Sequence, residues 1–341
     1  MRGVILQAPG DVRVVDRPDP VIEKPTDAII RVTAACICGS DLWPYRGADP
    51  VHEKPMGHEY VGVVDEIGSD VHSVAVGDVV VGSFVASDNT CEICEAGFQS
   101  RCIHQVMMGS IGTQAEKARI PLADGTLVIV PGTPTPAQAR SLLAASDVLG
   151  TGWFAAVAAE AGPGKTVAVV GDGAVGLMGV LAAKQLGAGR IIAMSRHADR
   201  QALARRFGAT DIVEERGKAG IAAIKDLTAG YGAHSTIEAV GTQESMAQAM
   251  GVTRAGGHIG FVGLAHDVQI DGRELFVKTV SMLGGLAPVR RFLPELINLI
   301  MTDQIDPGVV FDMTLPLEEA AEGYRAMDER RAIKVLLETQ R

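Results

Sequence analysis

The chain of 341 residues lacks any long hydrophobic run. It contains no stretch of about 18 uncharged apolar residues, the length that a membrane-spanning helix needs. The N-terminal sequence MRGVILQAPGDVRVVD alternates like a β-strand and has no apolar core of the kind found in signal peptides. We therefore expect a soluble, cytoplasmic protein with no membrane partner.

Basic residues are also in short supply. The chain has 31 lysines and arginines against 41 aspartates and glutamates, a formal net charge of -10, and it has no basic stripe. Because nucleic acids are bound through clustered positive charge, this balance argues against a nucleic-acid partner.

Cysteines number only five, an odd count, and a reducing cytoplasm does not favour disulfide bonds. Three of them lie in DNTCEICEAGFQSRC, residues 88–102. Metal binding or thiolate chemistry explains such clustering better than a disulfide framework does.

The sequence is rich in glycine, and its residue pattern changes along the chain. Residues 1 to about 130 consist of short apolar runs cut by glycine and proline, which is typical of a curled, barrel-like β domain. From residue 165, strands such as TVAVV and RIIAM alternate with helical segments. This alternation predicts an α/β fold in which βαβ units form a parallel sheet of about six strands.

The motif GDGAVG, residues 171–176, follows the strand TVAVV and opens a helix. That is the context of a dinucleotide-binding loop in a Rossmann, doubly wound sheet, and a plain glycine turn is the alternative. The glycines permit a tight turn, backbone approach to a pyrophosphate and close helix packing, while the helix N-terminus offers free N–H groups. The predicted cofactor-binding residues are Gly171, Gly173, Ala174, Val175 and Gly176.

The cofactor type depends on the end of the second strand, RIIAM, where an acidic residue would bind the adenosine ribose of NAD. Here the strand is followed by Ser195, Arg196 and His197, so we expect no carboxylate to repel a 2′-phosphate. Arg196 can pair with that phosphate, helped by Ser195, His197 or Arg200. The sequence thus favours NADP(H), although Arg196 and Arg200 also fit the solvated start of a helix.

Cys38 in CICGSDLWPYRG and His58-Glu59 in KPMGHEYVGVV lie near glycines between expected strands. Taken alone, each fits a structural role as well as a metal site, because cysteines are often small buried hydrophobes and histidines often satisfied polar groups.

Taken together, the motifs CGSD, GHE, the cysteine-rich lobe, GDGAVG and SDVLGTGW (residues 146–153) resemble a zinc-dependent alcohol dehydrogenase of the medium-chain dehydrogenase/reductase superfamily. They span nearly the whole chain in the family's order. The resemblance implies a GroES-like β-barrel catalytic domain formed by residues 1–145 and 287–341, a Rossmann domain formed by residues 146–286, and an active site in the cleft between them.

The resemblance also implies that Cys38, His58 and Asp147 bind a catalytic zinc ion. A water, the substrate oxygen or Glu59 would complete the tetrahedron, which leaves the open position of a catalytic site. Asp147 stands where many relatives have cysteine, although aspartate is familiar there among secondary-alcohol enzymes. Asp41 is expected to orient His58.

Ser40 matches the hydroxyl that passes the alcohol proton outward in this family. Trp43 stands where a relay histidine is often found, so the outer relay departs from the family pattern and Trp43 is expected to line the substrate pocket instead. His52 is a candidate substitute base or, alternatively, an exposed loop histidine.

By the same resemblance, Thr151 would contact the nicotinamide, Val240 and Val262 would line its carboxamide end, and Lys334 would bind the pyrophosphate. Core packing for the valines and a solvated charge for the lysine are the alternatives.

The lobe of residues 88–102 reproduces the spacing of the family's structural zinc site, with aspartate in place of the first cysteine. A carboxylate is a harder ligand than a thiolate, but it binds zinc at about 2.0 to 2.2 Å. We expect an occupied structural site, distinct from the catalytic one, with the ligands Asp88, Cys91, Cys94 and Cys102.

The resulting prediction is a zinc-dependent oxidoreductase that transfers hydride between NADP(H) and a small alcohol, ketone or aldehyde, with a secondary alcohol or ketone as the expected substrate. Two alternatives are a zinc-independent quinone or enoyl reductase of the same superfamily and a non-catalytic NADPH-binding redox sensor. The resemblance further implies a homodimer or homotetramer.

Overall fold

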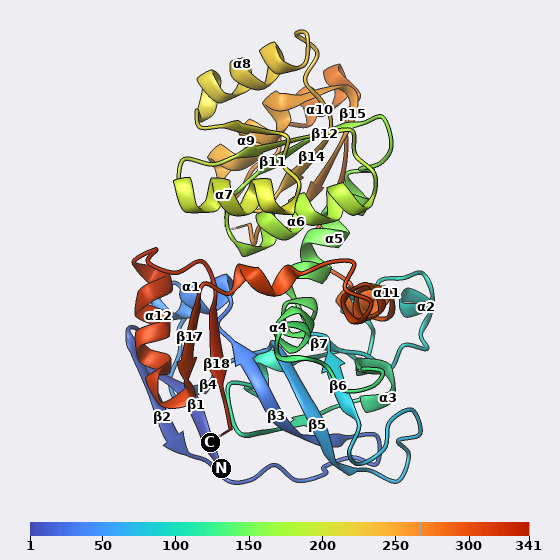
Figure 1. The fold of residues 1–341 in the computed structure, drawn as a ribbon, viewed down its shortest axis with the longest axis vertical. Coiled ribbons are helices and arrows are strands. Elements are labelled where there is room, and N and C mark those ends of the chain that lie inside the picture. The colour runs from blue at the N-terminus through green and yellow to red at the C-terminus, as the bar shows by residue number, and fades with distance from the viewer. Residues whose placement is uncertain (266, 341) are drawn as a thin grey trace. The chain divides into compact units, whose positions relative to one another are not determined.

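The computed structural model describes residues 1–265 and 267–340, which form two compact units, Met1–Gly150 with Pro288–Arg341, and Thr151–Ala287. Within this part of the chain no single helix is long and apolar enough to span a membrane. The helices Pro136–Ala145 and Val148–Ala158, which are bent relative to each other, reach the length and apolar composition of a membrane span only when they are taken together. The fold is drawn in Figure 1.

The first unit is built on a seven-stranded sheet of order β10-β6-β5-β3-β18-β17, with β9 paired to β3. A three-stranded sheet (β2-β1-β4) and the pair β7-β8 accompany it. The strands are β1 Arg2–Ala8, β2 Asp11–Asp16, β3 Ala28–Cys36, β4 Lys54–Pro55, β5 Tyr60–Ile67, β6 Val79–Gly82, β7 Val85–Ala86, β8 Val106–Met107, β9 Lys117–Ile120, β10 Leu127–Ile129, β17 Met313–Pro316 and β18 Val335–Glu338. The helices are α1 Leu42–Tyr45, α2 Glu92–Glu95, α3 Ala123–Thr126, α4 Pro136–Ala145, α11 Val289–Met301 and α12 Ala320–Asp328.

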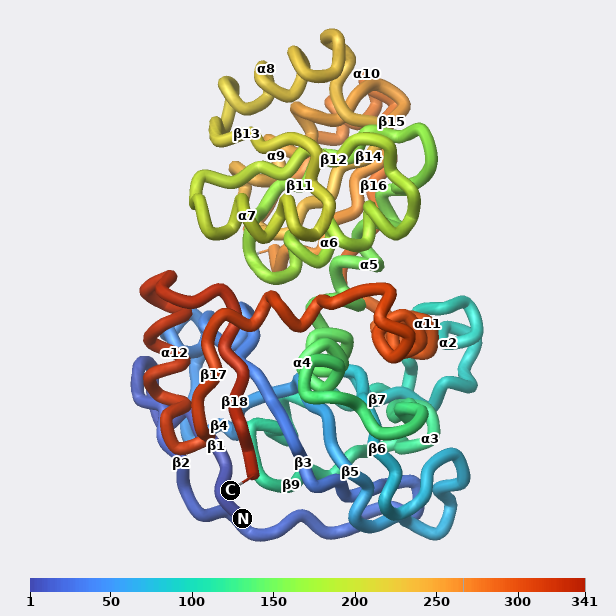
Figure 2. The backbone as a smooth tube through the Cα atoms, in the orientation of Figure 1, coloured from blue at the N-terminus to red at the C-terminus, as the bar shows by residue number. Residues whose placement is uncertain are grey.

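The C-terminal segment returns to this first sheet. β18 pairs antiparallel with β3, with Leu336 opposite Cys36. Figure 2 shows the red trace of β17 and β18 beside the blue trace of β3. This pairing brings the residues just before β18 alongside the loop that follows β3.

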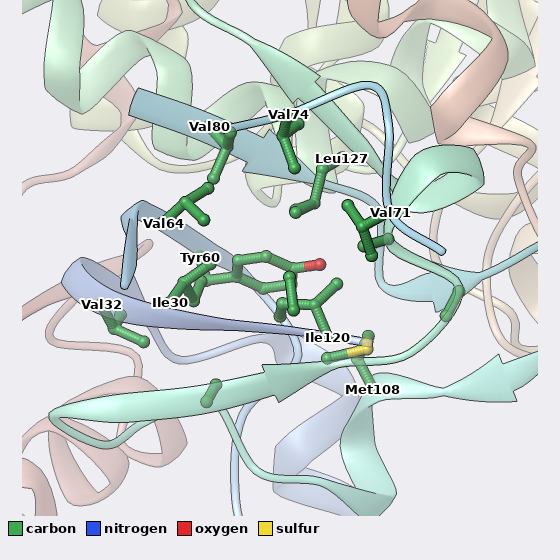
Figure 3. Packing of buried hydrophobic residues seen from close by; sticks show 14 of the residues in the cluster. Ile30, Val32, Tyr60, Val64, Val71, Val74, Val80, Met108, Ile120 and Leu127 are labelled. Carbon is green, nitrogen blue, oxygen red and sulfur yellow. The ribbon is translucent and has the colours of Figure 1, made fainter. Parts of the chain in front are cut away.

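The interior of the first unit is apolar. Figure 3 shows Tyr60 at the start of β5 packed among Ile30, Val64, Ile120 and Leu127. Burying such side chains stabilises the fold by roughly 1.5–3 kcal/mol each. Since Tyr60 follows His58 and Glu59 directly, this packing fixes the position of both polar residues.

The second unit contains a six-stranded sheet of order β13-β12-β11-β14-β15-β16, and every pairing in it is parallel. Its elements are β11 Thr166–Val170, α6 Ala174–Gln185, β12 Arg190–Met194, α7 Ala198–Phe207, β13 Asp211–Val213, α8 Gly217–Leu227, β14 Ala233–Glu238, α9 Gln243–Val252, β15 Thr253–Phe261, α10 Gly272–Lys278 and β16 Ser281–Gly284. Helix α5, Val148–Ala158, leads into this unit.

Helices α6 and α7 cover one face of this sheet, and α8 and α9 cover the other (Figure 1). Because both faces are covered, strands such as TVAVV are almost wholly buried and read as continuous apolar runs. The predicted α/β class with a doubly wound parallel sheet is confirmed.

Candidate active site and metal centres

Cys38 and His58 come together because β3 and β5 are antiparallel neighbours. Ala35, near the end of β3, lies opposite Tyr60, the first residue of β5. The residues that follow β3 and those that precede β5 therefore meet at the same edge of the sheet. The 3₁₀ turn Gly39–Asp41 then carries Ser40 and Asp41 beside them.

Asp147 reaches the same place from the break between α4 and α5, which bend by 52° relative to each other. Its Oδ2 lies 3.6 Å from Sγ of Cys38 and 3.3 Å from Nε2 of His58. With Glu59, these residues form a group whose ligand atoms all lie within 4.8 Å of one another. The structure thus brings together all four residues that were predicted to surround a catalytic zinc.

The electrostatics of this cluster fit a cation. Burial raises the pKa of the Cys38 thiol, and the carboxylates of Asp147 and Glu59 raise it further. Burial alone would lower the pKa of His58, but Asp41 and Cys38 outweigh it and hold this pKa well above its ordinary value. Acidic groups crowded together out of water are costly unless a positive charge joins them, and a sulfur, nitrogen and oxygen donor set suits zinc.

Asp41 lies behind His58, with its Oδ1 3.5 Å from Nδ1 of the imidazole. Its Oδ2 accepts hydrogen bonds from the Cys38 N–H (3.0 Å) and from Nε2 of Gln114 (3.2 Å). The hydroxyl of Tyr324 donates to Oε1 of Gln114 at 2.9 Å. Gln114 and Tyr324 carry no sequence motif, so this support for the histidine could not be predicted from the sequence.

Lys334 lies beside Glu59 of the metal-ligand group. Its side chain is only 1% exposed, and Nζ donates to Oε1 of Glu59 and to the carbonyl of Ile37. The thiol of Cys36 donates to the other oxygen of Glu59 at 3.1 Å. The ammonium group is thus held by Glu59 and Ile37 in this structure, and its assignment to the cofactor pyrophosphate stays a prediction.

The remaining residues near the cluster differ in exposure. Ser40 and Trp43 are half-buried, in the 3₁₀ turn and in α1 respectively, while His52 is exposed. Thr151 is buried within α5. Exposure makes a loop residue the better description of His52.

The lobe of residues 88–104 forms a second group of possible ligands, Asp88, Cys91, Cys94 and Cys102, again within 4.8 Å of one another. Oδ1 of Asp88 lies 3.6 Å from Sγ of Cys94 and 3.2 Å from Sγ of Cys102. All three thiols are free. The aspartate thus occupies the place of a fourth sulfur.

His104 contacts the other oxygen of Asp88, at 2.6 Å from its Nδ1. Burial would raise the pKa of Asp88, but hydrogen bonds from the Thr90 N–H and from His104 outweigh it and lower this pKa. A partner of this kind orients a carboxylate ligand. His104 was not among the residues predicted for this lobe, although its spacing from Cys102 is the signal in the sequence that could have identified it.

The GDGAVG loop has the predicted geometry. Gly171 has φ +118°, a conformation that favours glycine, and a Cβ on Gly176 would lie 2.0 Å from the Gly171 carbonyl oxygen. A Cβ on Gly173, the N-cap of α6, would meet nothing within 4 Å. The loop is therefore closed where helix and strand pack and open where a ligand backbone contact is expected.

One expectation about the neighbouring strand end is wrong, because a carboxylate does lie there. Asp172 projects from the loop, and its Oδ2 accepts a hydrogen bond from the Ser195 hydroxyl at 2.7 Å. Its Oδ1 lies 3.4 Å from Nη1 of Arg200. Arg196 is exposed and His197 half-buried. Two of the groups assigned to a 2′-phosphate are thus already in contact with an acid.

Val240 and Val262 lie at the ends of neighbouring strands, and Glu238 connects their loops. Its carboxylate accepts from the N–H groups of Val240 (2.9 Å) and Gly241 (2.8 Å), while its carbonyl accepts from the Val262 N–H (2.8 Å). Val240 is 36% exposed, which leaves its side chain accessible at this edge.

Comparisons with known proteins agree with this geometry. The alcohol dehydrogenase GroES-like domain matches residues 24–132, and the zinc-binding dehydrogenase family matches residues 174–302. The chain is 39% identical over 332 residues to a probable zinc-binding alcohol dehydrogenase of Mycobacterium tuberculosis, covering 95% of this chain and 84% of that protein. It is 34% identical over 349 residues to zinc-type alcohol dehydrogenase B of Aspergillus flavus, covering 98% and 81%.

Among solved structures, alcohol dehydrogenase TADH from Thermus sp. ATN1 matches with a TM-score of 0.92 and 32% sequence identity, over 100% of both chains. The GroES-like character of the N-terminal part is confirmed by these matches.

Proposed function

Since this chain belongs to the zinc-dependent alcohol dehydrogenases of the medium-chain dehydrogenase/reductase superfamily, we propose that it transfers hydride between NADP(H) and a small secondary alcohol or ketone. The family makes it an oxidoreductase acting on alcohols that uses zinc and a nicotinamide cofactor. The choice of NADP(H), the substrate class and the roles of single residues are the proposal.

The observation that carries the proposal is the buried group of Cys38, His58, Glu59 and Asp147. The two alternatives are a quinone or enoyl reductase that works without zinc and a non-catalytic NADPH-binding protein. Neither has an evident use for such a set of ligands. The family resemblance supports a secondary alcohol as the substrate, because aspartate at the position of Asp147 is familiar among secondary-alcohol enzymes.

When bound, zinc stabilises negative charge on the substrate oxygen and the nicotinamide gives or takes the hydride. Cys38, His58 and Asp147 hold the ion, and Asp41 keeps the imidazole of His58 in orientation. Ser40, in the turn directly after Cys38, would pass the proton of the alcohol outward: its hydroxyl oxygen receives that proton while its own hydroxyl proton leaves to water. Trp43 lines the substrate side. Glu59 is held back by Lys334 and Cys36.

The first prediction tests the ligand set. Replacing His58 or Asp147 by alanine should lower kcat by about three orders of magnitude, because the charge on the substrate oxygen then goes unstabilised. The Kd of NADPH, measured through the fluorescence of the cofactor, should stay within about twofold of the wild-type value. His72→Ala, which removes an exposed histidine of the same unit, is the matched control.

Zinc content is measured on the same samples. Undiminished turnover by the metal-depleted Asp147→Ala protein would rule the proposal out.

The second prediction concerns NADP(H). Arg196 is exposed beside the end of β12 and is free of the contacts that hold Arg200, so it is our main candidate partner of the 2′-phosphate. Arg196→Gln should raise the Kd of NADPH about tenfold and leave that of NADH unchanged, because a charge-assisted hydrogen bond is lost. Arg273→Gln, an exposed arginine on α10, is the control.

The measurement is a titration of both cofactors, together with turnover of ketones, aldehydes and quinones. A wild-type preference for NADH, with no effect of Arg196→Gln, would contradict the NADP(H) assignment.

The lobe with Asp88 is proposed to bind a second, structural zinc ion, since its four donors lie as close together as those of the first group. A homodimer or homotetramer is proposed on the family resemblance.

A further inference from the structure

The loop between β11 and α6 presents a carboxylate that the family motif does not require. Asp172 is the variable residue between the first two glycines, yet its side chain is only 12% exposed. It accepts a hydrogen bond from the Ser195 hydroxyl, and the guanidinium of Arg200 contacts both its Oδ1 (3.4 Å) and its backbone carbonyl (3.3 Å). Arg200 is itself only 14% exposed.

These contacts put a negative charge at the position that decides between the two cofactors. In a Rossmann fold an acidic residue at the end of the second strand binds the ribose hydroxyls of NAD and repels the phosphate of NADP. In this chain the side chain at that strand end is Ser195, and the acid bonded to its hydroxyl comes from the neighbouring strand's loop.

The negative charge of Asp172 is partly compensated by a neighbouring arginine. Arg200 pairs with Asp172, and Arg196 is an exposed cation next to Ser195, while Asp199 and Glu214 are acids at the surface of the same region. Arg200 therefore has two possible functions: it binds a phosphate directly, or it neutralises Asp172. The ion pair already formed in the protein favours the second.

We propose that Asp172 is the specificity-determining carboxylate of the dinucleotide site, and that Arg200 tempers its repulsion of a 2′-phosphate by pairing with it. This inference rests on the proposed function only in that the site binds a nicotinamide dinucleotide. A carboxylate at this position would repel a 2′-phosphate, and repulsion between like charges that are partly shielded from water is strong enough to change a cofactor preference.

The test compares four proteins: wild type, Asp172→Asn, Arg200→Gln and the double variant. Kd values for NADPH and for NADH are measured by titration without substrate, so turnover is not needed. Asp172→Asn keeps the shape of the side chain and the acceptor for Ser195 but removes the charge. It should raise the ratio of NADPH to NADH affinity about tenfold.

The double-mutant cycle separates the two functions of Arg200. If Arg200 only neutralises Asp172, Arg200→Gln lowers the ratio several-fold in the wild-type background and has little effect in the Asp172→Asn background. An equal loss in both backgrounds means that Arg200 binds the phosphate itself and overturns the proposed pairing.

The control is Asp226→Asn, an exposed acid on α8, which should leave the ratio unchanged. Melting temperatures of all variants establish that they are folded. A change of less than about twofold in Asp172→Asn overturns the assignment of Asp172.

A different result would contradict the NADP(H) proposal alone. If the wild type prefers NADH and Arg196→Gln has no effect, that proposal is wrong, but Asp172→Asn must still raise the ratio of NADPH to NADH affinity. Absence of binding of either cofactor to the wild type overturns both.

Discussion

At the scale of the residue, the least expected contact is the buried pair of Lys334 and Glu59. Both side chains are almost entirely out of water. The net contribution of such a pair to stability is small, because desolvation offsets the attraction between the charges. Removing only one partner is costly, because the other charge then stays buried without compensation.

We therefore predict that Lys334→Met lowers the free energy of unfolding by about 3 kcal/mol. Lys117 is the matched control: it pairs with Asp65 at 2.9 Å, but its side chain is 32% exposed. Lys117→Met should cost less than about 1 kcal/mol, because water screens a surface pair. Denaturant unfolding of the zinc-loaded proteins measures both. Equal losses in the two variants would mean that Lys334 is not a buried ion-pair partner.

At the scale of the element, the turn between β11 and α6 shows how the glycine pattern works. A Cβ on Gly176 would collide with the Gly171 carbonyl, whereas a Cβ on Gly173 meets open space. Any effect of an added methyl group at Gly173 therefore has to come from a ligand.

The prediction contrasts these two substitutions. Gly176→Ala should lower both the melting temperature and cofactor affinity, because the loop cannot close against the helix. Gly173→Ala should leave the melting temperature nearly unchanged and raise the cofactor Kd by about tenfold or more, because the methyl group keeps the pyrophosphate from the backbone. Thermal melting and cofactor titration supply the two readings. Wild-type affinity in Gly173→Ala would contradict a phosphate-binding role for this loop.

At this scale, the strands and the glycine loop could be predicted from the sequence, whereas the contacts between distant elements could not. The parallel strands and the glycine loop were predictable because their signals are local: buried apolar runs, and glycines at fixed spacing. The pairs Lys334–Glu59 and Tyr324–Gln114 join residues 275 and 210 positions apart. No spacing rule encodes such contacts, since they depend on the C-terminal segment packing in the same unit as the N-terminal one.

Asp172 was missed for another reason. The expected acid was sought at the end of β12, whereas the structure supplies it from the end of β11, 23 residues earlier in the chain. Neighbouring parallel strands end at the same edge of the sheet, so one strand can provide the side chain that the rule assigns to the next. In the same way, Cys38, His58 and the supporting Asp41 could be identified from their motifs, but Gln114 and Tyr324 behind Asp41 could not.

At the scale of the whole molecule, the two candidate metal clusters lie in the first unit, while the candidate dinucleotide site lies in the second. Among the described residues, no further group of three or more possible metal ligands was found in the second unit. We expect about two zinc ions per chain, and about one in either Cys38→Ser or Cys102→Ser.

This division predicts a local response to metal removal. Ligands that lose their cation leave buried acidic groups uncompensated, so chelation should destabilise the segments that hold them. Hydrogen exchange should speed up in residues 88–104 and around Cys38, His58 and Asp147, and the amides of β11 and β12 should keep their protection. Cys102→Ser, compared with Cys38→Ser, should confine the change to the lobe. Loss of protection throughout the six-stranded sheet on chelation would show that zinc supports the entire chain and that the two units do not respond separately.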